Sequence, residues 1–285
     1  MSVFRSAEGR VRSGWVIATF AAIAGALGFL WVIGIDFLGV GGADSLEPRL
    51  VFSTSASLVS GLIATGACWL LFTEPTALDT RPARPLLLGF GLGALAIALS
   101  VVPPVLVGAQ TLSLNHEWSA ARAALEFLAL APAGVGEELL LRGLALQALR
   151  RGVGDVPAIA ASSALFGVLH LTNPHASWVA ALIITLVGLW FGAMLVRTGT
   201  LWAPMGLHLG WNFFEGSVLG QPVSGLSPGT PLFVAHWPAE RGFWSGAHFG
   251  PEAAGWTVVV LLIATALTLV LGRGAGPKPP SSSLT

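Results

Sequence analysis

Long apolar stretches alternate with short polar segments along most of the chain. Eight of these stretches are apolar enough, and at about 20 residues mostly long enough, to form membrane-spanning helices. They are residues 14–35, 50–72, 86–108, 118–149, 158–171, 178–196, 201–219 and 254–271. The pattern predicts an all-α, polytopic membrane helix bundle of about eight transmembrane helices, with one membrane-embedded domain over residues 1–273.

The polar segments between the stretches hold the basic residues unevenly. If the N-terminus lies in the cytoplasm, ten basic residues fall in cytoplasmic segments, and only Arg49 and Arg241 fall in segments on the opposite side. Cytoplasmic loops of membrane proteins carry such an excess, so we expect both termini to be cytoplasmic. The final segment, 274–285, is rich in proline and serine and is expected to be a disordered cytoplasmic tail.

The composition agrees with a membrane protein and excludes other classes. Hydrophobic residues make up 54% of the chain and charged residues 10%, whereas soluble domains have about 25% charged residues. The formal net charge of zero gives no indication of nucleic-acid binding, which usually requires an excess of positive charge. The single cysteine, Cys68, excludes an intrachain disulfide. Thirteen arginines against one lysine suggest a GC-rich bacterial source. We therefore expect an integral protein of a bacterial cytoplasmic membrane, with the lipid bilayer as a partner; the oligomeric state stays open.

Three ionisable residues interrupt the apolar stretch 118–149. They are Glu137, Glu138 and Arg142. A charge at this depth in a bilayer is costly, so such residues face a protein interior or a water-filled cavity and commonly serve function. Glu138 and Arg142 are spaced i, i+4 and are expected to pair, whereas Glu137 points about 100° away and can have a separate role.

Polar side chains on other stretches are expected at a similar depth. Glu137, His170, His208 and Asn212 each lie 11 to 15 residues from a predicted cytoplasmic helix end. At 1.5 Å per residue this distance is about 16 to 22 Å, close to the middle of a bilayer. Side chains from three helices are therefore expected to meet in one site.

Together these residues form three ordered motifs that resemble a known family. The motifs are Glu137-Glu138-x-x-x-Arg142, Phe166-x-x-x-His170 and His208-x-x-x-Asn212. They resemble those of the CPBP intramembrane protease family, which groups the CAAX prenyl endopeptidases of the Ras-converting-enzyme type with the bacterial Abi proteins. The resemblance covers the motif-bearing core, residues 119–218. One departure is the Leu139–Leu141 run, where an aromatic residue is often found.

The resemblance implies an intramembrane, glutamate-dependent endopeptidase. Its substrate would be a peptide or a membrane-associated protein, and Glu137 would be the general base that activates water. His170 would orient the water or carry its proton, and His208 and Asn212 would donate hydrogen bonds to the oxyanion. Glu138 and Arg142 would support the site. The identity of the substrate and its cleavage site stay open.

Other interpretations of the same residues stay open as well. Glu137, His170 and His208 could hold a zinc ion with a water as fourth ligand, although no HExxH sequence is present and we favour hydrolysis without a cofactor. A second hypothesis is that the protein is a catalytically idle scaffold or immunity protein of the same family. A proton-linked transporter is a third, although the polar residues show no internal repeat.

Several further features have less defined roles. Glu126 and Glu215 could pair helices or line a cavity, and the segment 220–253 could cap the site from the outer interface. Glycine pairs spaced four residues apart predict close helix packing. These pairs are Gly89 and Gly93, Gly188 and Gly192, and Gly206 and Gly210.

Overall fold

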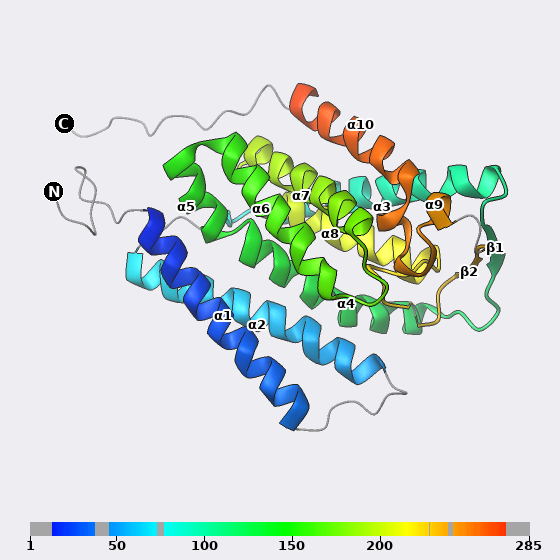
Figure 1. Ribbon diagram of the computed structural model, residues 1–285, viewed down its shortest axis with the longest axis horizontal. Helices are drawn as coiled ribbons and strands as arrows, with labels where there is room; N and C mark the ends of the chain where they lie inside the picture. Colours follow the sequence, from blue (N-terminus) through cyan, green and yellow to red (C-terminus); the bar gives the residue numbers. More distant parts are fainter. Residues whose placement is uncertain (1–12, 38–45, 73–76, 228, 239–241, 272–285) are drawn as a thin grey trace.

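The computed structural model describes residues 13–37, 46–72, 77–227, 229–238 and 242–271. These residues form a bundle of helices that run side by side along the long axis of the molecule (Figure 1). The main helices are α1 (Ser13–Phe37), α2 (Leu46–Phe72), α3 (Ala83–Leu106), α4 (Ala120–Leu141), α5 (Leu144–Val153), α6 (Asp155–Leu169), α7 (Trp178–Thr198), α8 (Trp202–Phe213) and α10 (Gly255–Leu271).

The prediction of a helical membrane protein is confirmed. Within the described residues, α1, α2, α3, α6 with the turn that follows it, and α7 are long and apolar enough to cross a membrane, and α10 is a shorter apolar helix. Leucines on the outer faces, such as Leu87, Leu106 and Leu271, are largely exposed, whereas Ile97 and Phe191 in the core are fully buried. This distribution fits a bundle whose outer surface faces lipid. The total of eight spans stays a prediction.

One predicted helix is broken. The stretch 118–149 forms α4 and α5 rather than one continuous helix. α4 ends where the backbone N–H groups of Arg142 and Gly143 both donate to the carbonyl of Glu138 at 2.9 Å. A Cβ at Gly143 would lie 2.3 Å from the carbonyl oxygen of Leu139, so the turn requires glycine. Hydropathy alone could not reveal this break, because the first residues of α5, from Leu144 to Leu146, continue the apolar run of α4.

The all-α prediction also needs a small correction. The strands β1 (Thr111–Leu114) and β2 (Phe233–His236) form a two-stranded antiparallel sheet at one end of the bundle (Figure 1). Each strand has only four residues, which is too short for a period-two pattern to predict. The segment 220–253 also contains the short helix α9 (Gly242–Ser245).

The glycine pairs on α3 and α8 pack against each other, as the spacing predicts. A Cβ at Gly93 would lie 2.1 Å from the carbonyl oxygen of Leu207, and one at Gly210 would lie 2.0 Å from that of Phe90. The backbones of the two helices therefore touch, which is the close approach that small residues permit in membrane bundles. Because His208 lies on α8 between these contacts, its position depends on the α3–α8 packing.

The segments that connect consecutive helices fall into two groups, and contacts join the segments within each group. In one group, the backbone N–H of Leu201 donates to the carbonyl of Ala77 at 2.8 Å, which joins the α2–α3 and α7–α8 connections. In the other, β1 pairs with β2, and Asn173 Nδ2 donates to the carbonyl of Ser224 at 3.1 Å. Each contact joins connections that an alternating path of the chain through the membrane would place on the same side.

We expect Gly93→Ala to destabilise the protein by about 1 to 3 kcal/mol, the usual range for overpacking. The added methyl group would press on the backbone of α8. Thermal unfolding of the purified protein in detergent measures the effect. Gly91→Ala is the matched control, because a Cβ at Gly91, on the same helix, meets no atom within 4 Å. Equal loss of stability in both variants would contradict the packing argument.

Candidate active site

A buried ion pair lies at the end of α4, as the i, i+4 spacing predicts. Arg142 Nη1 donates to Glu138 Oε1 at 2.9 Å, and both side chains are 0% exposed. The same oxygen lies 3.2 Å from Nδ1 of His208 on α8. Because a carboxylate paired with arginine only accepts hydrogen bonds, Nδ1 is the donor. Glu138 therefore links the end of α4 to α8.

Two aromatic rings contact the guanidinium of Arg142, and a glycine leaves space for it. The guanidinium carbon of Arg142 lies 4.3 Å from the ring centroid of Phe166 on α6 and 5.6 Å from that of Phe191 on α7. Both contacts are within the range of cation–π attraction. A Cβ at Gly188 on α7 would lie 2.9 Å from Arg142 Nη2. Gly188, predicted only as a packing residue, thus provides the space for the buried charge.

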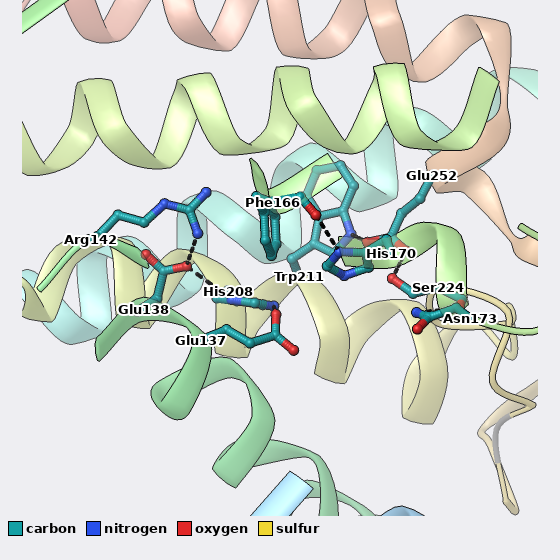
Figure 2. A network of polar contacts seen from close by, with 10 residues as sticks. All are labelled: Glu137, Glu138, Arg142, Phe166, His170, Asn173, His208, Trp211, Ser224 and Glu252. Atoms are coloured by element: carbon teal, nitrogen blue, oxygen red, sulfur yellow. Dashed lines mark hydrogen bonds and ion pairs between the residues drawn. The ribbon is translucent and has the colours of Figure 1, made fainter. Parts of the chain in front are cut away.

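Glu137 differs from its neighbour in exposure. Its side chain is 27% exposed, whereas that of Glu138 is 0% exposed. Its Oε2 lies 3.8 Å from Nε2 of His208, so the imidazole ring has one glutamate at each nitrogen (Figure 2). The different orientations predicted for the two glutamates are therefore present. The depth expected for Glu137 assumed one continuous helix up to its cytoplasmic end. Because the chain breaks between α4 and α5, that residue count does not give a distance along one helix.

His170 lies at the C-terminal end of α6, where a 3-10 turn, His170–Thr172, begins. Its Nδ1 lies 2.8 Å from the carbonyl oxygen of Phe166, one turn earlier. A backbone carbonyl can only accept a hydrogen bond, so Nδ1 carries the hydrogen and Nε2 of the neutral ring has a free lone pair. The motif Phe166-x-x-x-His170 thus fixes the tautomer of its own histidine.

Phe166 lies between two groups of polar residues (Figure 2). The ring centroid of Phe166 is 4.5 Å from that of His170 and 6.0 Å from that of His208. Glu137, Glu138, Arg142 and His208 form the group on one side of this ring, and His170 belongs to the group on the other side. The structure therefore brings residues of all three motifs to one region.

Asn212 lies on α8 one turn after His208 and is 8% exposed. Within the described residues, its side-chain amide makes no hydrogen bond, so its N–H groups are available to another molecule.

The residues do not form a ready metal site. Within the described part of the chain, no three His, Cys, Asp or Glu side chains are placed to hold a metal ion. The predicted zinc ligands, Glu137, His170 and His208, therefore do not converge on one point. Zinc requires three or four donors at about 2.0 to 2.2 Å from one centre for nitrogen and oxygen ligands.

Two glutamates with open roles have definite positions. Glu126 Oε1 on α4 accepts a hydrogen bond from the backbone N–H of Thr230, which ties α4 to the segment 220–253. Glu215, in the π-helical turn after α8, is 0% exposed, and both of its oxygens lack a hydrogen bond within the described residues. Glu126 thus holds a loop in place, whereas Glu215 is a buried carboxyl next to the site.

Sequence reasoning missed Glu252, which is buried in the second polar group beside His170 (Figure 2). It belongs to none of the three motifs and lies in the segment 220–253, where a carboxylate is normally solvated. No signal in the sequence distinguishes it from an ordinary loop residue.

The comparison with family models agrees with the motifs. Residues 119–214 match the family described as Rce1-like, type II CAAX prenyl endopeptidase. A comparison with curated proteins returns no match. The matched stretch contains all three motifs and runs from the start of α4 to the end of α8. The predicted resemblance is thereby confirmed, and over residues 119–214 this membrane protein is similar to the Rce1-like CAAX protease family.

Proposed function

We propose that this protein is a glutamate-dependent intramembrane endopeptidase that cleaves a peptide or a membrane-associated protein. The observation that carries the proposal is the contrast between two adjacent glutamates. Glu138 is fully buried and paired with Arg142, whereas Glu137 is partly exposed and lies beside the ring of His208. A general base must reach water, and of the two glutamates only Glu137 can do so.

The residues have distinct roles in this reaction. Glu137 takes a proton from water, the resulting hydroxide adds to the scissile carbonyl, and the C–N bond breaks as the amine receives that proton. His170 orients the water or carries the proton through the free lone pair of Nε2. The donors that we assign to the oxyanion are the Asn212 amide and Nε2 of His208 in its imidazolium form, in which both ring nitrogens carry a hydrogen. Glu138 and Arg142 hold His208 in place through Nδ1.

The same substitution at the two glutamates tests this division of roles. We expect Glu137→Gln to lower the cleavage rate by about 10²- to 10⁴-fold, the usual contribution of a general base, while thermal stability stays close to wild type. Glu138→Gln leaves Arg142 buried without its ion pair and is expected to cost about 3 to 5 kcal/mol of stability.

Cleavage is measured by quantitative comparison of membrane and secreted peptides in cells that carry each variant. Thermal unfolding in detergent measures stability. Normal peptide processing with Glu137→Gln would remove Glu137 from the mechanism. If the cellular phenotype also survived, it would favour the catalytically idle scaffold.

We also propose that the reaction needs no metal or other cofactor. This proposal is supported by the arrangement of Glu137, His170 and His208, which do not converge on one point. Incubation with a strong zinc chelator is expected to leave the cleavage rate unchanged, and elemental analysis of active protein is expected to find well under one zinc per chain. Loss of activity in chelator, restored by zinc, would overturn the proposal.

We propose that the chain crosses a bacterial cytoplasmic membrane eight times with both termini in the cytoplasm. The contacts that join connections of the same predicted side support this path, and the distribution of arginine supports its direction.

Labelling of single cysteines tests this topology in a Cys68→Ala background. Leu114 in β1 and Val153 at the end of α5 are both more than half exposed, at 56% and 52%. A membrane-impermeant maleimide is expected to label Leu114→Cys in intact spheroplasts and Val153→Cys only after permeabilisation. The reverse pattern would invert the topology.

A further inference from the structure

Glu252, in the segment 220–253, is the centre of a buried polar group beside the candidate active site (Figure 2). The residue is 5% exposed. Its Oε1 accepts a hydrogen bond from Trp211 Nε1 at 3.1 Å, and its Oε2 accepts one from Ser224 Oγ at 2.5 Å. It lies outside the stretch that matches the Rce1-like family, residues 119–214. Its role is therefore not assigned by the family motifs.

The partners of Glu252 connect it to two of the elements that carry site residues. Trp211 directly precedes Asn212 and follows His208 by three residues on α8. On the α6 side, the carbonyl of Ser224 accepts a hydrogen bond from Asn173 Nδ2 at 3.1 Å, and Asn173 is the residue that ends the 3-10 turn begun by His170. Through these bonds, Glu252 restrains α8 and the end of α6 from the same point.

The charge of Glu252 faces the site. Burial raises the pKa of the Glu252 carboxyl, and the hydrogen bond from Ser224 and the nearby rings of His170 and His208 oppose this rise. The neighbouring carboxyl, Glu215, accepts no hydrogen bond within the described residues, whereas Glu252 accepts two. Hydrogen bonds to a carboxylate favour its ionised form, so the two donors to Glu252 stabilise a negative charge on this member of the pair against the effect of burial.

A role limited to fastening the loop would not need this charge. A glutamine could accept the bond from Trp211 through its amide oxygen and donate one to Ser224 Oγ through its amide nitrogen, without the desolvation that a buried carboxylate undergoes. The carboxylate adds a fixed negative charge near His170 and His208. A fixed charge of this kind stabilises any positive charge that develops on the rings as protons move.

We propose that Glu252 is a positioning residue of the hydrolytic site, which orients Asn212 through Trp211 and holds a negative charge opposite the two histidines. The proposal rests on the proposed endopeptidase function. It also gives the segment 220–253 a place in that function, since this segment supplies both Glu252 and its partner Ser224.

The test is a double-mutant cycle on the bond between Glu252 and Trp211. The assay uses purified full-length protein in detergent and a synthetic copy of a peptide whose cleavage Glu137→Gln abolishes in cells. Glu252→Gln, which removes the charge, and Trp211→Phe, which removes the donor, are each expected to lower kcat by about tenfold with little change in KM. In the cycle, Glu252→Ala removes the acceptor, and the double variant of Glu252→Ala with Trp211→Phe is expected to be no slower than the slower of its two single variants.

Trp190→Phe is the matched control. Trp190 is also a buried indole and packs against Trp211, with 6.5 Å between the ring centroids, but its N–H donates to Thr268 Oγ1 at 3.0 Å rather than to Glu252. Trp190→Phe removes this N–H donor and is expected to leave kcat within about twofold of wild type. An equal fall in kcat for Trp190→Phe and Trp211→Phe would show a general packing effect and overturn the proposal.

The remaining outcomes separate this proposal from the proposed function. Unchanged kcat in Glu252→Gln, or multiplicative effects in the double variant, overturns the positioning role while Glu137→Gln still supports the protease. If Glu252→Gln does not accumulate in membranes, Ser224→Ala is used instead, because it removes one of the two donors to Glu252. This variant is expected to lower kcat about threefold, and an unchanged kcat would overturn the positioning role of Glu252. Normal cleavage by Glu137→Gln would instead overturn the proposed function itself.

Discussion

The buried pair of Arg142 and Glu138 is the interaction on which the rest of the site depends. Two charges removed from water are stable only if their geometry is good and their surroundings compensate for lost hydration. The structure provides an ion pair of 2.9 Å, the ring of Phe166 against the guanidinium, and the space left by Gly188, while Nε and Nη2 of Arg142 make no hydrogen bond within the described residues. Side chains from α4, α6 and α7 are therefore fixed relative to one another by one arginine.

The same pair orients the histidine of α8. Glu138 Oε1 accepts hydrogen bonds from both Arg142 and His208. Arg142 therefore fixes the position of the oxygen that orients the imidazole ring. This constraint turns Nε2 of His208 toward Glu137. The α3–α8 backbone contact at Gly93 and Gly210 fixes the helix that carries the histidine. Charge pairing and glycine packing thus set the same side chain from two directions.

The sequence predicted those features that depend on local spacing. The i, i+4 distance between Glu138 and Arg142 implied their pairing, and the glycine spacing on α3 and α8 implied their close contact; both are present. The break at Gly143 was missed because the apolar run of α4 continues past it through Leu144 and Leu146. The two-stranded sheet was missed because its strands are far apart in sequence and short. These features depend on tertiary contacts that periodicity does not record.

Glu252 shows why part of a site can escape motif reasoning. The three motifs lie on α4, α6 and α8, where an ionisable residue stands out against apolar neighbours. In a segment between helices, a glutamate is the expected solvated residue, and only folding decides whether it is buried. Here the segment folds back over the end of α6, through the contact of Ser224 with Asn173, and brings Glu252 to Trp211. The membrane helices thus carry the three motifs, while a segment outside the family match brings a buried carboxylate to the same region.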